Sequence, residues 1–337
     1  MLIIIKGALK CFGMAKVSVI IPVFNEEENI DHLVYELNSY FQQETRYSTE
    51  IIFVNDGSSD GTMEKLKHAP HHSYSYKIIS FSRNFGSHAA LRAGILRAKG
   101  DYITFMYADL QDPLTLVSQL YDEMERKGVD ITWAFRNSTA VAKTEKLFSS
   151  AYAALMRRYA VPNFPKKGFD IVMFSKKVKA CLDNNVENNS SIFIQILSLG
   201  FKQTGITYDK RVRLLGKSKW TLSKKIKLLI DSFVAFSFAP IRLVSFIGIV
   251  FFLLGIVWTG YIVFRKIVFD DLASGWPALL SILMVGFGIT NISLGIIAEY
   301  LWRTLDASRK RPVFVIDEIV EGILEPKPDK RVLIDIK

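Results

Sequence analysis

Short hydrophobic runs rich in β-branched residues alternate with helical patterns between residues 16 and 135. The five runs that we expect to form strands are residues 17–22, 50–54, 77–81, 102–106 and 130–134. Helical patterns lie between them, near residues 27–41, 62–67, 87–97 and 113–127. Strands joined by helical crossovers predict an α/β fold with a doubly wound, mostly parallel sheet. In such a sheet, ligands bind beyond the carboxyl ends of the strands.

Two long apolar runs in the second half of the chain, residues 243–264 and 276–297, contain no Asp, Glu, Lys or Arg. Each is about 22 residues, which at about 1.5 Å per residue is enough to cross a hydrocarbon core of about 30 Å. The alternative is a pair of buried core helices, but such helices rarely stay uncharged for so long. We therefore expect two membrane-spanning helices.

Basic residues flank these runs. Arg242 precedes the first run, and Arg303, Arg309 and Lys310 follow the second. The positive-inside rule then predicts that both flanks, and with them both termini, are cytosolic. Residues 219–230 place cations on one side and large apolar side chains on the other, which is typical of an interfacial helix; an ordinary amphipathic helix on the soluble domain is the alternative.

The composition narrows the class of protein. The chain has 337 residues, half of them hydrophobic, which excludes disorder and collagen-like repeats. Its 43 Lys and Arg against 33 Asp and Glu give a net charge of +10, which indicates an anionic partner without choosing among membrane phosphates, nucleotides and nucleic acid. Cys11 and Cys181 have no C-x-x-C spacing, so the sequence predicts neither a zinc site nor a disulfide framework.

These patterns predict the following order of regions along the chain. Residues 1–15 are an N-terminal extension, with Met1 or Met14 as the start, and residues 16–215 are a cytosolic α/β domain. Amphipathic interfacial helices at 216–240 lead into a two-helix transmembrane region at 241–300, and a cytosolic C-terminal tail covers 301–337.

Polar, glycine-bearing and acidic segments follow four of the predicted strands, at residues 25–26, 55–61, 82–86 and 107–113. Each alone is an ordinary turn or helix cap, but together they occupy successive strand ends. Neither the G-x-G-x-x-G of hydride-transfer enzymes nor the Walker A pattern is present. The sequence therefore predicts a site whose carboxylates hold a divalent cation against a pyrophosphate, beside acids and amides that bind a base and a ribose.

The segments at residues 19–26, 55–60, 82–86 and 108–113 resemble the family 2 inverting glycosyltransferases. Within that family, the turn at 167–170, the segment at 216–221 and the two apolar runs are similar to the polyprenyl-phosphate glycosyltransferases, the group of bactoprenol glucosyltransferase and dolichol-phosphate mannose synthase. The resemblance covers about residues 16–316. It implies a GT-A-like nucleotide-sugar domain at the bacterial cytoplasmic (inner) membrane, a multi-pass protein that works in the cell envelope.

The resemblance also implies roles for single residues. Five match the turns that contact the nucleotide: Pro22, Asn25, Glu26, Asp56 and Ser58. Asp109 and Gln111 match the positions that hold Mg²⁺ or Mn²⁺ beside the diphosphate. The cation there stabilises the leaving diphosphate, which makes Asp109 a candidate catalytic residue. Tyr107 stands where the family usually has an Asp, and we expect its hydroxyl to contact the donor's ribose or sugar; the alternative is that it only fills space.

The implied reaction is attack of a polyprenyl (undecaprenyl) phosphate oxygen on the anomeric carbon of a UDP-sugar, with inversion. A phosphate monoester has its second pKa near 6, so a strong general base is less necessary. Asp170 matches an Asp proposed as the base, and it is interpreted as base or acceptor-positioning group, with a turn-capping Asp as the equal alternative. Four cations just upstream of the predicted interfacial helix could clamp the lipid phosphate, and a solvated basic face near anionic lipid explains each of them equally well: Arg211, Arg213, Lys217 and Lys219.

Two other functions use the same nucleotide site. A processive polysaccharide synthase needs more membrane helices and a Q-x-x-R-W segment, which the sequence does not contain. A membrane-anchored scaffold would have lost activity when Tyr107 replaced the first acid, but Asp56, Asp109 and Asp170 are all retained. We therefore expect a nucleotide-sugar donor, a polyprenyl phosphate acceptor and a lipid bilayer as partners, with no nucleic acid; a homo-oligomer is left open.

Overall fold

The computed structural model describes residues 14–137, 169–183, 191–209, 275–309 and 312–322, with scattered residues of 153–165 and 244–268. The chain divides into two compact units. The first consists of Met1–Ser150, Pro165–Lys219 and Pro312–Lys337, and the second of Ala151–Phe164 and Trp220–Arg311. The four predicted strand-end segments all belong to the first unit.

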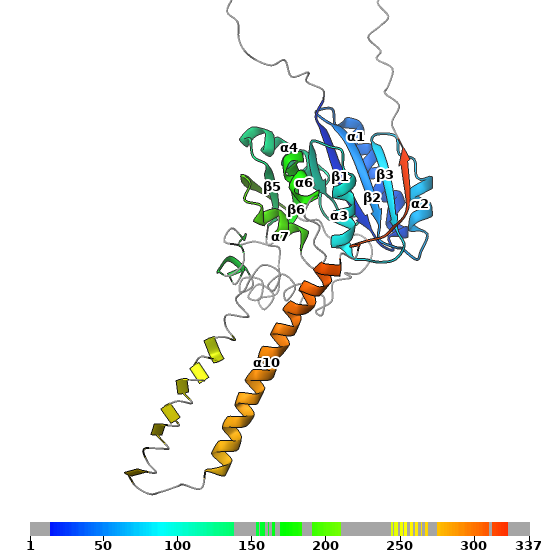
Figure 1. Cartoon of the computed structure of the whole chain (residues 1–337). Helices are drawn as coiled ribbons and strands as arrows, with labels where there is room; N and C mark the ends of the chain where they lie inside the picture. The colour runs from blue at the N-terminus through cyan, green and yellow to red at the C-terminus, as the bar shows by residue number, and fades with distance from the viewer. Residues whose placement is uncertain are drawn as a thin grey trace, which may run out of the picture. The chain divides into compact units, whose positions relative to one another are not determined.

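One mixed sheet forms the centre of the first unit (Figure 1). Its strands are β1 (Lys16–Val23), β2 (Ser48–Asn55), β3 (Ser75–Phe81), β4 (Tyr102–Phe105), β5 (Ile131–Arg136), β6 (Phe169–Ser175), β7 (Gln203–Tyr208) and β8 (Ile316–Gly322). Their order is β7-β5-β6-β4-β1-β2-β3-β8. Strand β6 is antiparallel to β4 and β5, β8 is antiparallel to β3, and the other pairs are parallel. The predicted α/β fold with a mostly parallel sheet is confirmed.

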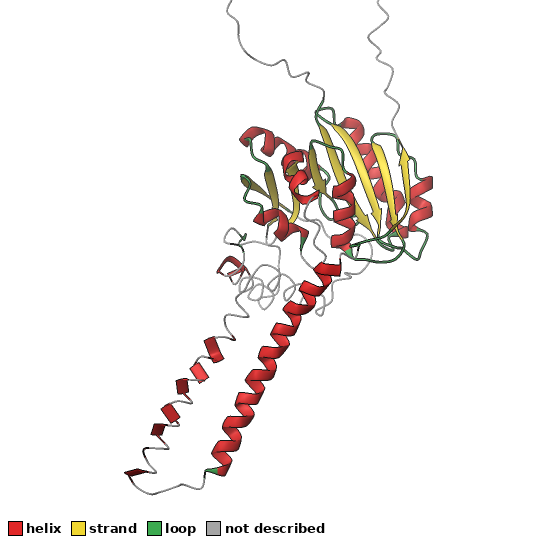
Figure 2. Cartoon of the chain, in the orientation of Figure 1, coloured by secondary structure: helices red, strands yellow, loops and turns green. Residues whose placement is uncertain are grey.

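The helices of the first unit lie on both faces of this sheet (Figure 2). They are α1 (Glu27–Gln43), α2 (Thr62–His68), α3 (Ser87–Arg97), α4 (Thr115–Lys127), α6 (Lys176–Asp183) and α7 (Ile192–Ser198). Side chains of α1, α2 and α4 share one buried cluster with alternate residues of β1. Helix α3 contacts β1, β2, α6 and α7. The four predicted crossover helices correspond to α1–α4.

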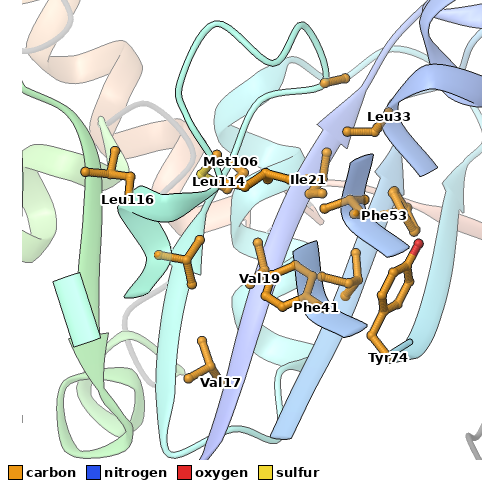
Figure 3. Close-up of a cluster of buried hydrophobic side chains, with 14 of the residues drawn as sticks. Val17, Val19, Ile21, Leu33, Phe41, Phe53, Tyr74, Met106, Leu114 and Leu116 are labelled. Atoms are coloured by element: carbon orange, nitrogen blue, oxygen red, sulfur yellow. The ribbon is translucent and has the colours of Figure 1, made fainter. Parts of the chain in front are cut away.

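Strand β1 shows why the sequence forms a buried parallel strand. Its residues alternate between the two faces, as strand geometry requires. Val19 and Ile21 point into the cluster with Leu33 of α1, which Figure 3 shows together with Phe53 of β2. Ile20 points to the other face, where a Cβ on Gly94 of α3 would lie only 2.3 Å from its Cγ2. Glycine at this position therefore lets α3 approach β1 closely.

Strand β8 comes from the range 301–337, for which the sequence pattern predicts only a tail. Residues 316–322 pair antiparallel with β3, with Ile78 opposite Val320 and Ile79 opposite Ile319. Three of the seven β8 residues are acidic and three are apolar, in a mixed order, so β8 lacks the long apolar run that marks β1 and β2. The C-terminal region therefore completes the sheet of the first unit.

The second unit contains α10 (Trp276–Arg309), which includes the second predicted apolar run. Over the residues that the structure describes, no helix combines the length and the apolar character of a membrane span. The two predicted spans are therefore not confirmed and stay predictions. Residues 210–243, which include the predicted interfacial helix, lie outside the described part of the chain.

Candidate active site

The four predicted strand-end segments lie at the same end of the sheet. Strands β1, β2, β3 and β4 run parallel to one another, so their carboxyl ends share one edge. The segments 24–26, 55–61, 82–86 and 106–113 follow these ends directly. This is the edge where ligands bind in open α/β sheets.

The turns after β1 and β2 are bonded to each other. Asn25 has a positive φ of 51°, a conformation that Asn adopts more readily than most residues. Its backbone N–H donates to Ser58 Oγ at 3.0 Å, and its Oδ1 accepts the Ser59 N–H at 2.9 Å. Asn55, buried at the end of β2, accepts the Ser58 N–H at 3.2 Å. Asn25 and Ser58, both predicted to contact the nucleotide, are therefore in direct contact.

Glu26 lies at the start of α1 and joins the same network. Its backbone N–H donates to Thr62 Oγ1 at 2.9 Å, and its Oε2 accepts the Asn29 Nδ2 at 2.6 Å. Pro22 lies within β1, opposite Val54 of β2. Because proline has no backbone N–H, Pro22 cannot donate a hydrogen bond to a neighbouring strand. The structure thus brings Pro22, Asn25 and Glu26 to one strand end, as predicted; their contact with a nucleotide stays a prediction.

Asp56 fastens the turn that follows β3. Its side chain is buried, with 3% of the residue exposed. Its Oδ1 accepts the Phe85 N–H at 2.7 Å, and its Oδ2 accepts the Gly86 N–H at 2.9 Å. Burial raises the pKa of Asp56 above its ordinary value, while these two backbone hydrogen bonds act to lower it. The residue predicted to read the base therefore also holds residues 82–86, a structural role that the sequence did not reveal.

Gly57 brings the same two turns into backbone contact. Its φ is +65°, and a Cβ there would lie 2.3 Å from the carbonyl carbon of Arg83. Any side chain would therefore push the turn after β3 away from the turn after β2. We name residues 55–58 and 82–86 together the nucleotide turns, after the role predicted for Asp56 and Ser58.

The turn after β4, residues 107–113, carries the predicted cation ligands, and we name it the cation turn. Leu110 has a positive φ of 49°, and its N–H donates to the Tyr107 carbonyl at 3.3 Å. The Gln111 N–H donates to Asp109 Oδ1 at 3.4 Å. Tyr107, Asp109 and Gln111 are half-buried in this turn. The three predicted residues therefore lie on one short turn, beside the carboxyl end of β1 and the start of β6.

The residues present suit a divalent cation that takes few ligands from the protein. Within the described ranges, no group of three or more His, Cys, Asp or Glu side chains gathers at one point. Asp109 and Gln111 offer a carboxylate and an amide oxygen, the donor types that Mg²⁺ and Mn²⁺ prefer. Mg²⁺ commonly keeps several waters and binds substrate phosphates beside one or two carboxylates. Asp109 and Gln111 thus fit a cation that completes its shell with a diphosphate.

A buried pair behind this turn was not predicted. Asp112 is 1% exposed, and its Oδ1 accepts the Tyr208 hydroxyl at 2.6 Å. Tyr208 ends β7, and its carbonyl accepts the Asn137 N–H at 2.9 Å. The pair ties the cation turn to the ends of β5 and β7. Asp112, next to Pro113, belongs to one of the predicted segments. Nothing in the sequence pointed to Tyr208, 96 residues away, as its partner.

Asp170 is the second residue of β6, rather than part of the turn that the sequence suggested. The β4–β6 register places Tyr102 opposite Ser175 and Thr104 opposite Met173. Because the two strands are antiparallel, the start of β6 lies toward the carboxyl end of β4, from which the cation turn follows. The backbone of Asp170 is therefore on the side of the predicted site. The four predicted phosphate-clamping residues are outside the described residues: Arg211, Arg213, Lys217 and Lys219.

Comparison with known proteins adds evidence that is independent of this geometry. The family described as Glycosyl transferase family 2 matches residues 18–181. An uncharacterized glycosyltransferase, YkcC of Bacillus subtilis, is 32% identical over 89% of this chain and 93% of its own length. A prophage bactoprenol glucosyl transferase homolog of Escherichia coli is 30% identical over 90% of this chain and 99% of its own length.

A more distant likeness is to the solved mannosyltransferase PcManGT of Pyrobaculum calidifontis, in complex with GDP-Man and Mn²⁺. It has 19% identity and a TM-score of 0.39, and it covers 59% of this chain and 56% of that chain. The full-length likeness to the curated relatives is the stronger finding. On that finding, the chain is a glycosyltransferase and belongs to glycosyltransferase family 2.

Proposed function

We propose that the chain transfers one sugar from a UDP-sugar to the phosphate of a polyprenyl phosphate, at the cytosolic face of a bacterial cytoplasmic membrane. The observation that carries this proposal is the gathering of the nucleotide turns and the cation turn at one edge of the sheet. The acceptor is argued from relatives named bactoprenol glucosyl transferase, which match this chain over nearly their whole length.

The turns after β1 and β2 supply the groups that a base and a ribose need. Asp56 contributes buried carboxylate oxygens, and Asn25 and Ser58 contribute an amide and a hydroxyl beside them. The network between the two turns fixes these groups before any ligand arrives. Preorganisation of this kind lowers the entropy that binding costs.

The cation turn serves the leaving group. When a divalent cation is bound there, it neutralises charge that develops on the departing diphosphate. Asp109 and Gln111 would hold that cation, and the Asp112–Tyr208 hydrogen bond fixes the turn that carries both residues. Asp109 and Gln111 would thus orient the cation, with charge contributed by Asp109, and neither would take part in forming or breaking a bond.

The acceptor needs little activation at cytosolic pH. A phosphate monoester is largely dianionic near pH 7, so its oxygen can attack the anomeric carbon as the bond to the diphosphate breaks. Inversion follows because attack and departure occur on opposite faces of that carbon. Asp170, at the start of β6, is proposed to position the acceptor or to take up its remaining proton. Arg211, Arg213, Lys217 and Lys219 are proposed to hold the lipid phosphate.

Attachment to the membrane is part of the same proposal. Helix α10 is 34 residues long, and large apolar side chains along it are exposed, among them Leu283 at 58%, Phe287 at 71% and Ile292 at 64%. A lipid-phosphate acceptor is itself held in a bilayer. An enzyme that is anchored there meets its acceptor by diffusion in two dimensions.

A single transfer assay tests this function. The purified full chain is incubated with polyprenyl phosphate and a panel of radiolabelled UDP- and GDP-sugars, and radioactivity in the organic-extractable lipid is counted. We expect one sugar per lipid from a UDP-sugar, and loss of transfer in Asp109→Asn. Polymer formation would instead identify a processive synthase. No transfer from any donor, with intact fold by circular dichroism, would favour the inactive scaffold.

A further inference from the structure

The segment that follows α10 in the sequence contacts the turn at residues 82–86. Helix α10 ends at Arg309, and five residues later Phe314 contacts β3 of the first unit. Residues 312–322, which we name the C-terminal segment, then pair with residues 76–81 of β3 through β8. The pairing extends past the end of β3, because the Ser82 N–H donates to the Val315 carbonyl at 3.1 Å.

Three aromatic rings connect this segment to the turn at 82–86. The ring of Phe314 stacks on Phe81, with centroids 5.1 Å apart and planes 10° from parallel. Phe81 meets Phe85 edge to face, with centroids 5.7 Å apart. The guanidinium of Arg83 lies 4.2 Å from the centroid of Phe85. Contacts of these types are favourable and depend on orientation, so the rings fix one another's positions.

Phe85 links the rings to the predicted base-reading residue. Its backbone N–H donates to Asp56 at 2.7 Å, and the next residue, Gly86, donates to the other carboxylate oxygen. Ser82, Arg83 and Asn84 are exposed, so the turn has few buried contacts of its own. Its position therefore depends on Asp56 from one side and on Phe81, supported by Phe314, from the other.

Two ion pairs hold β8 within the C-terminal segment. Lys77 of β3 is 4% exposed and lies 3.0 Å from Glu321, and Lys67 of α2 lies 2.8 Å from Glu318. Breaking the Lys77 pair would leave a buried ammonium without this partner, which is costly. The segment is therefore anchored independently of Phe314, and a change at Phe314 can be studied with β8 still in place.

We propose that Phe314 is a positioning residue for the nucleotide, and that donor binding depends on the segment that follows α10. This inference rests on the proposed function, because it takes the site to bind a nucleotide-sugar. Phe314 touches no reacting group; it acts through Phe81 and Phe85 on the turn that holds Asp56. The stretch of chain that follows the proposed membrane helix thereby becomes part of the donor site.

Phe314→Ala in the full chain tests the inference, with Ile319→Ala as the matched control. Ile319 is an apolar residue of the same C-terminal segment, within β8; it is 37% exposed and lies opposite Ile79, away from the turn. Titration calorimetry with UDP, and with GDP as the second probe, should give a Kd for Phe314→Ala about three- to tenfold above wild type. Phe314→Tyr, which keeps the ring, should restore the wild-type Kd, and Ile319→Ala should not change it.

Hydrogen exchange in the absence of nucleotide gives a second readout. The amides of Phe85 and Gly86 should exchange faster in Phe314→Ala and at the wild-type rate in Ile319→Ala. An unchanged Kd together with unchanged exchange in Phe314→Ala would overturn the inference, as would equal effects of the two substitutions. If the wild-type protein binds neither UDP nor GDP, the proposed function is refuted, and the claim on donor affinity with it. If the wild-type protein binds and Phe314→Ala binds equally well, only the inference about Phe314 is refuted.

Discussion

His88 provides a quantitative test of how α3 packs beside the nucleotide turns. It is the second residue of α3, and its ring meets Phe193 of α7 edge to face at 6.1 Å. Burial, with a smaller contribution from the charge of Arg92, lowers the pKa of His88 to about 4. Its Nδ1 has no hydrogen-bond partner within the described part of the chain. Protonation would therefore place a charge where solvent is largely excluded.

The direction of the pH effect follows from that lowered pKa. Between about pH 6.5 and 4, the unfolded chain binds a proton at His88 that the folded chain does not bind. The free energy of unfolding therefore falls as the pH drops through this window. A pKa difference of about 2.5 corresponds to about 3 kcal/mol in total, of which about 2 kcal/mol is lost between pH 7 and pH 5.

Urea unfolding of the purified chain at pH 7 and pH 5 measures this loss. His88→Phe keeps an aromatic ring against Phe193 and should remove most of the difference between the two pH values. His68→Gln is the control, because the side chain of His68 is 80% exposed. Burial raises the pKa of Asp56, so its contribution has the opposite sign and is common to all variants. The same pH dependence in wild type and His88→Phe would refute this account of α3.

Three further predictions concern the cation turn. Asp109→Asn should reduce turnover by orders of magnitude with an unchanged far-ultraviolet circular dichroism spectrum, and full activity in excess EDTA would contradict a role for a cation. Tyr208→Phe removes the hydroxyl that donates to the buried carboxylate of Asp112, and should lower the free energy of unfolding by about 1–3 kcal/mol and raise the Mn²⁺ concentration needed for half-maximal activity. Tyr107→Phe should lower kcat/KM by about fivefold or more if its hydroxyl contacts the donor, and a ratio to wild type near one would show that it only fills space.

β1 and β2 could be predicted from the sequence because their own residues are mostly apolar and therefore expected to be buried. β1 and β2 are almost entirely buried, and their β-branched residues leave a continuous apolar run that indicates a central parallel strand. β8 lacks such a run: three acidic residues, Asp317, Glu318 and Glu321, interrupt its apolar residues and are exposed at the edge of the sheet. Its identity as a strand comes from pairing with β3, more than 230 residues earlier in the chain. Pairing over such a distance is not encoded in any local pattern.

The same distinction applies to the site. The positions of Asn25, Ser58 and Asp109 follow from strand ends, which the hydrophobic pattern marks, so the turns that carry them were predictable. The partners of Asp112 and Asp56 were not, because Tyr208 and the backbone of Phe85 offer no chemical signature in the sequence. A side chain reveals what it can bind, whereas its actual partner depends on the tertiary fold.

The structural role of Asp56 leaves room for the base contact that the sequence predicts for the same carboxylate. An ionised carboxylate has about four acceptor sites on its two oxygens, and the Phe85 and Gly86 amides do not fill them all. Asp56 can therefore hold the turn at 82–86 and still accept an N–H from a base. Uracil and guanine both present such an N–H, so an acceptor at this position binds either base without choosing between them. On the prediction that Asp56 contacts the base, selection of the donor falls to the shape of the turns around it. The contact between Gly57 and Arg83 and the stacking of Phe314 on Phe81 contribute to that shape.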